Sequence, residues 1–394
     1  MESRVHVVGL GVISAIGKTV DETLTSFENH RHGLGPLSLF DSVHRQLPVG
    51  EVKISNTQLA NELAIKGSFN RTTLLGIYAA RHALNSVKLS LPWRRGILSG
   101  TTVGGMDRSE KFFSQYVAGA DADFSLVKDH ECGSVTERIA EDLGATDHIS
   151  TINTACSSSV NSIIYASRLI KQGYLDVAIA GGVDSLTKFT LNGFNSLMIL
   201  DKELCKPFDA DRNGLNLGEG AGFLVLVSDQ VLRDEALNSL CTISGYGNTN
   251  DAFHQTASSE DGRGSFLAME SALRSSRLKP SQIDYINLHG TGTKNNDSSE
   301  GVAVQRLFGD IVPLASSTKS FTGHTLGASG GIEAVFSVMS LVHGCVFPNL
   351  RFQSKMAEVN FSPIREFKNA LNVRHVMSNS FGFGGNCSSI IFSR

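Results

Sequence analysis

The sequence predicts an α/β protein made of two similar halves. Short apolar runs alternate with longer helical patterns, which is typical of buried strands connected by helices. Segments 150–185 and 313–348 each combine a Ser/Thr/Gly-rich loop, a helical pattern and a following apolar strand, which indicates an internal duplication. Although 394 residues would by length suggest two to three domains, we expect two closely packed halves of one fold, residues 1–240 and 241–394.

The two clearest helices lie at equivalent places in these segments. Apolar side chains recur at helical spacing over Val160–Ile170 and over Ile332–Val342, and Gly173 and Gly344 end the two patterns. The first helix follows the predicted strand Ile149–Ile152. The other predicted strands are Val5–Val8, Val177–Ala180, Phe223–Val227, Ile283–Leu288 and Ser389–Phe392.

Composition argues against several classes of protein. The formal charge is −3 and no run of Lys or Arg occurs, so we expect no nucleic-acid partner. The six cysteines are scattered without a CxxC pair, which predicts free thiols and no metal site. The sequence contains no run of 18 or more apolar residues, so it predicts no membrane span. The start MESRVHVVGLGVIS does not resemble a signal peptide. We therefore expect a cytoplasmic protein.

Glycine-rich runs give no support for a bound nucleotide. Gly9-Leu10-Gly11 follows a predicted strand, but Ser14 stands where a dinucleotide-binding fingerprint needs its third glycine. We therefore expect no NAD and no other cofactor.

The first candidate for chemistry is Cys156, in the run TACSSS at 154–159. The cysteine lies between a predicted strand and a predicted helix, where unpaired N–H groups and the helix dipole stabilise a thiolate and can donate to an oxyanion. A buried, inert cysteine is the alternative.

The second candidate is His289, in the run HGTGT at 289–293. A histidine at the end of a strand can polarise a carbonyl or transfer a proton near neutral pH. The glycines and hydroxyls around it suit an extended polar ligand, although a turn histidine bonded to backbone is the better interpretation of this motif alone.

The third candidate is the run KSFTGH at 319–324, which enters the second helix. Lys319 and His324 can converge when the intervening glycine permits a turn. A surface lysine beside a core histidine is the alternative. Glu333 lies one turn into a largely apolar helix, where an ionised carboxylate needs partners.

The fourth candidate is the run NSFGFGGN at 379–386. Three glycines around Phe383 predict a mobile loop whose ring can swing and whose amides can point at a substrate. A tight strand connection is the alternative.

A cysteine, two histidines and a lysine on such loops, in this chain order, resemble the condensing enzymes called β-ketoacyl-acyl-carrier-protein synthases. The resemblance covers nearly the whole chain and includes VVGLGVIS at 7–14, GGM at 104–106, AGGVD at 180–184 and KPFD at 206–209. It implies a thiolase-like five-layer α/β/α/β/α fold of two pseudo-duplicated halves. It also implies substrates carried on the phosphopantetheine of an acyl carrier protein, and a homodimer or a heterodimer with a related subunit.

The resemblance also implies roles for individual residues. Cys156 would take the acyl chain, and His289 and His324 would hold the malonyl thioester carbonyl and promote decarboxylation. Lys319 would tune the two histidines, and Glu333 would be a structural acid behind them.

Further residues would bind substrate. Thr291 and Thr293 match positions that bind the pantetheine arm, and Phe383 matches a gating ring whose amide helps to form the oxyanion hole. Gly384 and Gly385 belong to the same substrate-binding loop.

Some positions depart from the family pattern. Lys294 follows HGTGT, where the family commonly has proline, and three serines follow the nucleophile. Together with the run FTLNGFNSL at 189–197, these positions make the chain look more like ketosynthases of specialised clusters that make aryl polyenes or related pigments.

Two alternatives use the same fold. A non-decarboxylating thiolase or acyltransferase would use Cys156 but would leave the second histidine and Lys319 without a role. A non-catalytic chain-length-factor subunit normally lacks the nucleophile.

An acidic carrier protein needs a basic docking surface on an enzyme of net charge −3. We expect Lys66, Arg71, Lys206 and Arg212 to contribute to this surface.

Overall fold

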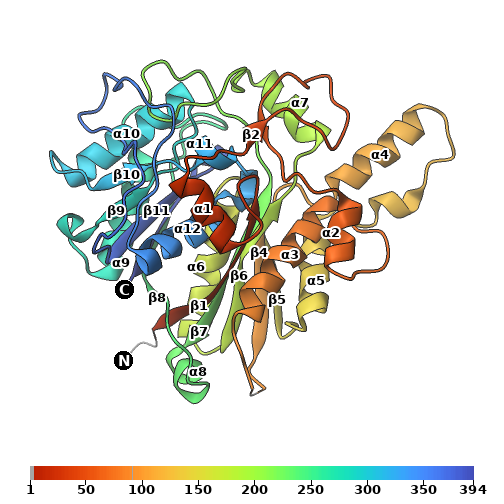
Figure 1. Ribbon diagram of the computed structural model, residues 1–394, viewed down its shortest axis with the longest axis horizontal. Coiled ribbons are helices and arrows are strands. Elements are labelled where there is room, and N and C mark those ends of the chain that lie inside the picture. The colour runs from red at the N-terminus through yellow and green to blue at the C-terminus, as the bar shows by residue number, and fades with distance from the viewer. Residues whose placement is uncertain (1–3, 91) are drawn as a thin grey trace.

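Figure 1 shows a computed structural model of the chain, which describes residues 4–90 and 92–394. The two-residue strands β2 (Leu34–Gly35) and β3 (Val49–Gly50) pair in a small antiparallel sheet of their own. All other strands belong to one large mixed sheet in the order β10-β9-β11-β12-β8-β1-β7-β6-β4-β5. Their bounds are β1 Val5–Ser14, β4 Arg95–Gly100, β5 His148–Ile152, β6 Val177–Asp184, β7 Gly220–Ser228, β8 Cys241–Asn250, β9 Tyr285–Asn287, β10 Leu314–Ser316, β11 His375–Phe381 and β12 Asn386–Ser393.

The order of the strands is symmetric about the contact between β1 and β8. On one side β7, β6, β4 and β5 follow β1, and on the other side β12, β11, β9 and β10 follow β8. Corresponding neighbours run in the same sense: β1–β7 and β8–β12 are antiparallel, whereas β4–β5 and β9–β10 are parallel. The predicted duplication is therefore confirmed in the topology of the sheet.

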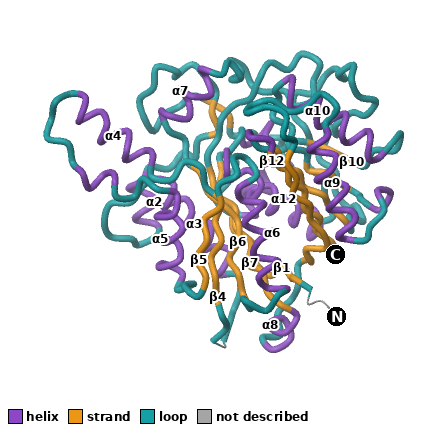
Figure 2. The backbone as a smooth tube through the Cα atoms, turned by 180° about the vertical axis from the view of Figure 1, so that it is seen from behind, coloured by secondary structure: helices purple, strands orange, loops and turns teal. Residues whose placement is uncertain are grey.

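Helices make three further layers around the two halves of the sheet (Figures 1 and 2). α3 (Arg71–Asn85) and α5 (Cys132–Leu143) cover the outer face of the first half, and α9 (Arg263–Ser276) and α10 (Lys294–Phe308) lie outside the second. α6 (Ser158–Lys171) and α12 (Ser329–His343) lie between the halves and pack against strands of both. The five-layer thiolase-like fold predicted from the family resemblance is confirmed.

The remaining helices lie at the periphery or near the loops above the sheet. They are α1 (Val20–Glu28), α2 (Asn56–Glu62), α4 (Met106–Val117), α7 (Lys188–Ser196), α8 (Asp229–Asp234) and α11 (Lys319–Thr322). α4 projects from the body of the molecule in Figure 1, and none of its residues is buried.

The central layer explains the most apolar segment of the chain. Leu326–His343 has the length and the mean hydropathy, 1.3, of a membrane-spanning helix, but 89% of this stretch is buried inside the fold. Its side chains pack in the main apolar cluster with those of α6, including Val160, Ile163 and Val335. α12 is thus the core helix of the duplicated fold.

One predicted strand is shorter than expected. The apolar run Ile283–Leu288 contains a strand only over Tyr285–Asn287. Pro280–Gln282 forms a 3-10 turn, and the Ile283 N–H bonds to the carbonyl of Pro280 rather than to a neighbouring strand. The other predicted strands and both predicted helices are present.

Candidate active site

Cys156 lies in the sharp turn that joins β5 to α6. Ala155, directly before it, has a left-handed φ of 54°, which is costly for a residue with a Cβ and reverses the chain within one residue. The thiol therefore sits beside the N-terminus of α6, and its residue is only 7% exposed.

His289 lies beyond β9 and is held by a carboxylate from the next helix. The backbone N–H groups of His289 and Gly290 donate to Glu300 of α10 at 2.9 and 2.8 Å. Asn379 of β11 donates to the same carboxylate at 3.1 Å. Gly290 has a φ of +34°, and a Cβ there would lie 2.6 Å from that of Ser317, so the loop needs glycine.

His324 lies between α11 and α12 and is oriented by the backbone. The N–H of Leu326 donates to its Nδ1 at 3.1 Å, and the Oγ of Ser329 lies 3.0 Å from the same nitrogen. The backbone of His324 also contacts the first half of the chain, because its N–H donates to the carbonyl of Asn216, in the loop before β7, at 2.7 Å.

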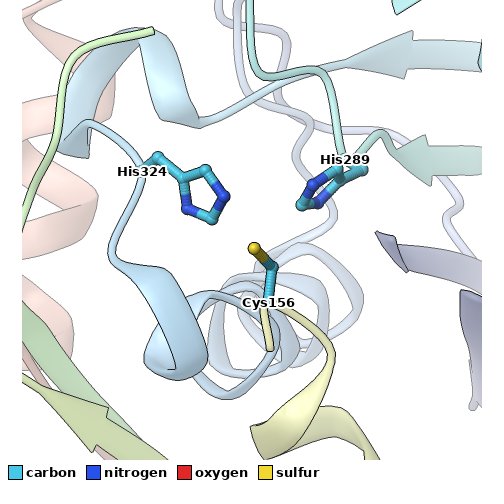
Figure 3. Close-up of side chains that lie close together, drawn as sticks. All are labelled: Cys156, His289 and His324. Carbon is cyan, nitrogen blue, oxygen red and sulfur yellow. The ribbon is translucent and has the colours of Figure 1, made fainter. Parts of the chain in front are cut away.

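The structure brings the thiol and the two imidazoles together in one buried cluster (Figure 3). One ligand-type atom from each of Cys156, His289 and His324 lies within 4.8 Å of the other two. The two rings are nearly perpendicular, with their centroids 5.4 Å apart. The three side chains line a cavity of about 400 Å³, and Thr291 and Thr293 also line it. The sequence predicted these residues on separate loops, and the fold places them at one site.

A buried ion pair lies behind the histidines. Lys319 of α11 pairs with Glu333 of α12, and the two side chains are only 2% and 4% exposed. The Nζ of Lys319 also lies 3.3 Å from Nδ1 of His289. Burial raises the pKa of Glu333 to about 7, and the neighbouring ammonium opposes this rise.

The neighbours of each histidine determine its tautomer. An ammonium can only donate, so Nδ1 of His289 accepts from Lys319, and Nδ1 of His324 accepts from the Leu326 amide. Burial lowers the pKa of both histidines well below the usual value, and the charge of Lys319 lowers it further. Both rings are therefore neutral near pH 7 and carry their proton on Nε2.

This protonation also bears on metal binding. Cys156, His289 and His324 offer three donor atoms at a spacing that a zinc ion could use. A ligating Nε2 would have to lose its proton, and the proton would move to an Nδ1 that already faces a donor. The cluster is better suited to donating hydrogen bonds than to holding a cation.

The electrostatics of the thiol differ from the expectation of a stabilised thiolate. Burial raises the pKa of Cys156 to about 11, although Lys319 and the backbone amides of Phe383 and Cys156 lower it. Removal of the sulfur from water outweighs these favourable interactions. The resting thiol is therefore protonated at neutral pH. The backbone amides of Phe383 and Cys156 can still donate hydrogen bonds to negative charge that forms beside the sulfur.

The glycine-rich loop closes one side of the cavity. Phe383, Gly384 and Gly385 line the cavity, and the ring of Phe383 stacks on Phe194 with centroids 5.9 Å apart. The N–H of Gly384 donates to Gln255 O at 2.7 Å, so the loop is tied to the segment that follows β8. Thr291 and Thr293 form another wall, with their hydroxyls 2.9 Å apart.

Two of the four predicted docking residues are enclosed by the protein. Arg71 is 6% exposed and forms a double hydrogen bond with Glu219, at 2.8 and 2.6 Å. Arg212 is 3% exposed and donates to the carbonyls of Asp209 and Lys294. The prediction that these arginines contribute to a docking surface is wrong, because each satisfies buried oxygens. Lys66 is exposed and Lys206 half-buried, and their docking role stays a prediction.

Sequence reasoning missed the acids that hold the loops. Besides Glu300, Asp297 accepts from the N–H groups of Phe208 and Gly292, and Asp184 accepts from those of Thr102, Val103 and Gly327. The sequence does contain a signal for Asp297 and Glu300, because these two acids are three residues apart and therefore share one face of α10. Nothing in the sequence shows that this face is buried.

Comparisons with known proteins agree with this architecture. Residues 2–231 match the family described as beta-ketoacyl synthase, N-terminal domain, and residues 240–353 match its C-terminal domain. The chain is 32% identical to a 3-oxoacyl-[acyl-carrier-protein] synthase 2 of Staphylococcus aureus, over 99% of this chain and 98% of that protein. It is 34% identical to the Synechocystis protein of the same name, over 100% and 98% of the two chains.

Solved structures are similar over the same length. The ishigamide ketosynthase/chain length factor has a TM-score of 0.94 and 28% identity, covering 100% of this chain and 99% of that one. A ketosynthase in complex with its chain length factor from Xenorhabdus doucetiae has a TM-score of 0.86 and 30% identity, with coverage of 99% and 98%. With its two sequence domains and whole-chain relatives above 30% identity, the chain belongs to the β-ketoacyl synthase family.

Proposed function

We propose that this protein condenses an acyl chain held on Cys156 with a malonyl group, releasing carbon dioxide and forming a β-ketoacyl carrier protein. The observation that carries the proposal is the convergence on one thiol of two neutral imidazoles, each held with its proton on Nε2. Two hydrogen-bond donors suit an enolate that forms by decarboxylation, because that step needs charge stabilisation rather than a base.

The first half-reaction is acyl transfer to the thiol. The sulfur of Cys156 attacks the acyl thioester, and the amides of Phe383 and Cys156 stabilise the oxyanion. The bond to the pantetheine sulfur breaks, and the thiol proton leaves with that sulfur. The products are an acyl-enzyme and a free pantetheine thiol.

The second half-reaction forms the carbon–carbon bond. The Nε2–H groups of His289 and His324 donate to the malonyl thioester oxygen while the bond to the carboxylate breaks and carbon dioxide departs. The α-carbon then attacks the acyl carbonyl, and the bond to Cys156 breaks. The thiolate released in this way takes up a proton from solvent water. Burial keeps both rings neutral by lowering their pKa values, and the charge of Lys319, which is paired with Glu333, adds to this effect.

The substrates arrive on a phosphopantetheine arm, and the protein needs no further cofactor. The cavity of about 400 Å³, with Thr291 and Thr293 on one wall and Phe383 on another, suits such an arm. The names of the relatives from Staphylococcus aureus and Synechocystis support an acyl carrier protein as the partner. Their synthase activity also supports a cytoplasmic place for the reaction.

We infer that two copies of the chain assemble into a homodimer. β5 is an edge strand of the sheet, and its Ile149 is 40% exposed. Tyr165 of α6, which is 36% exposed, packs against His148 of the same strand with ring centroids 5.8 Å apart. Such an edge is a site for pairing with another strand. Light scattering of the purified protein should give twice the chain mass. A complex found only on co-expression with a related subunit would instead show a heterodimer.

The reaction is tested directly with an acyl carrier protein loaded with acyl or malonyl groups. We expect a β-ketoacyl product and one carbon dioxide per condensation. Formation of acyl-Cys156 without decarboxylation would refute the synthase proposal in favour of acyl transfer. Intact-mass profiles of acyl groups trapped on Cys156, taken across several carrier proteins, identify the preferred starter.

A further inference from the structure

The oxyanion hole joins two segments that are far apart in the sequence. Cys156 and its amide belong to the turn before α6, whereas the amide of Phe383 belongs to the loop between β11 and β12. These segments approach closely, since a Cβ on Gly382 would lie 2.8 Å from Thr154 O and 3.1 Å from Cys156 N. A shift of either segment would separate the two amides.

The side chain of Asn386 connects these segments. Its Oδ1 accepts from three close donors, Ser157 Oγ at 2.7 Å, Asn161 Nδ2 at 2.9 Å and Asn248 Nδ2 at 2.9 Å. Ser388 Oγ is a fourth and more distant donor, at 3.4 Å. Ser157 directly follows the nucleophile, and its single hydroxyl proton is shared between Asn386 and the carbonyl of Thr154, also at 2.7 Å. Asn386 is the residue directly after Gly385 of the glycine-rich loop.

Further hydrogen bonds make this arrangement a network. Asn161 Nδ2 also donates to Thr154 Oγ1 at 2.9 Å, and Ser388 Oγ donates to Asn161 Oδ1 at 2.7 Å. With two amide nitrogens among its partners, Oδ1 of Asn386 has to be an acceptor, so the orientation of this side chain is determined. The network thus spans both halves of the duplicated fold.

We propose that Asn386 is a positioning residue that holds the Phe383 amide at the oxyanion hole by tying the glycine-rich loop to the nucleophile turn. The proposal rests on the proposed function and adds to it a group that touches neither substrate nor sulfur. Because Ser157, Asn161, Asn248 and Ser388 all donate to it, the carbonyl oxygen is the operative part of the side chain.

Two substitutions separate the role of the oxygen from the role of the shape. Asn386→Leu keeps a similar volume and removes the acceptor. Asn386→Asp keeps an acceptor for the same donors, and a carboxylate accepts such bonds strongly. Its charge raises the pKa of the nearby thiol, which slows both reactions of the sulfur, and it also repels the oxyanion, which slows acylation somewhat further.

Two rates of the same thiol make the test. Acylation by an acyl-pantetheine thioester passes through an oxyanion, whereas alkylation by iodoacetamide does not. We expect the ratio of acylation to alkylation to fall roughly 10- to 100-fold in Asn386→Leu, somewhat less than the full loss of an oxyanion donor. In Asn386→Asp, where the acceptor is kept, the ratio should fall clearly less than in Asn386→Leu.

Two outcomes would overturn the proposal. One is an unchanged ratio in Asn386→Leu, whether or not both reactions slow equally. The other is an equal fall of the ratio in the Leu and Asp variants. As a control, Asn70→Ala removes a buried acceptor outside the site, which bonds to the Thr73 amide at the start of α3, and should lower stability without changing the ratio.

If Asn386→Leu does not fold, a second variant tests the same hydrogen bonds. Asn248 is exposed and supplies one of the three close donors, so Asn248→Ala should fold and lower the ratio by a smaller factor. An unchanged ratio there would also count against the proposal. Neither rate involves malonyl decarboxylation. A protein that shows the expected ratios but forms no β-ketoacyl product would refute the proposed function and leave the role of Asn386 standing.

Discussion

The turns that begin the two central helices have the same shape and carry different chemistry. Ala155 and Leu326 each have a φ of 54°, and each lies three residues before the first residue of α6 or α12. The next residue is Cys156 in one turn and Gly327 in the other. A Cβ on Gly327 would lie 2.8 Å from Asp184 Oδ2, so the second turn has no room for a nucleophile.

The second turn supplies a histidine instead. His324 lies three residues before Gly327, where the first turn has Asn153 three residues before Cys156. The amide of Leu326, presented by its left-handed backbone, fixes the tautomer of that histidine. A duplicated turn thus holds a thiol in one copy and orients an imidazole in the other.

The largest expected effect comes from removing the nucleophile. Cys156→Ala should abolish the acyl-enzyme mass and all condensation, because the proposed acyl-enzyme forms on this sulfur. Intact-mass spectrometry after incubation with an acyl carrier protein checks this. Cys132→Ala, which changes a half-buried thiol at the start of α5, should keep the adduct. An adduct that persists in Cys156→Ala would exclude Cys156 as the nucleophile.

The second turn should matter for condensation more than for acylation. His324→Ala removes one of two donors to the enolate, so we expect condensation to slow roughly 100- to 1,000-fold while acyl-enzyme formation continues. Single-turnover measurements of each half-reaction separate the two steps. His343→Ala, at the exposed end of α12, is the control and should change neither. Equal loss of both half-reactions would assign His324 to acyl transfer instead.

The neutral histidines should also make stability depend on pH. Because their pKa values are lowered on folding, the unfolded chain binds more protons as pH falls below about 6.5, and folding stability is lost there. Between about pH 7.5 and 5.5 the two groups together should cost about 2–3 kcal/mol.

Denaturant unfolding of the wild type and of His289→Gln/His324→Gln at both pH values measures this loss. Glu333 acts in the opposite direction, since its raised pKa makes the folded state relatively less stable as pH rises from about 4.5 to 7, and it is present in both proteins. We expect the double variant to lose less stability on acidification. The same loss in both proteins would mean that the rings are not neutral in the folded state.

The lack of space at Gly327 gives a smaller effect on stability. Gly327→Ala places a methyl group 2.8 Å from Asp184 Oδ2 and 3.0 Å from Thr102 Cγ2, which should destabilise the fold by about 1–3 kcal/mol. Cys156→Ala, at the equivalent place in the other turn, should cost less because it only removes a sulfur. Thermal unfolding of the two variants measures their loss of stability. A larger loss of stability in Cys156→Ala than in Gly327→Ala would contradict the comparison of the turns.

The smallest effect should come from the surface. Lys206→Glu should raise the KM for the carrier protein a few-fold at low salt, with the difference shrinking as salt screens the charges. Lys66→Glu is measured in parallel. A KM that Lys206→Glu leaves unchanged at low salt would remove this residue from the docking surface.

Much of the site was predictable because its residues stand beside strong local signals. Cys156 precedes a helix that glycine ends, and the glycines around His289 and Phe383 mark loops where backbone can approach a ligand closely. The fold class followed from two segments with the same order of loop, helix and strand. These are properties of short stretches of chain, so the amino-acid pattern by itself determined them.

Other properties depend on what the fold packs around a residue. Arg71 and Arg212 look like surface cations in the sequence, but they satisfy carboxylate and carbonyl oxygens in the interior. Likewise, the position of Cys156 before a helix predicted a stabilised thiolate, whereas its burial raises the pKa to about 11.

The sequence by itself determined which groups carry chemistry and on which loops they stand. Only the tertiary structure decided their protonation and their partners, among them the Nε2–H tautomers and the three close donors that meet at Asn386. The physical reason is that desolvation and hydrogen bonding at a buried atom depend on groups from distant parts of the chain. No local pattern records which groups those will be.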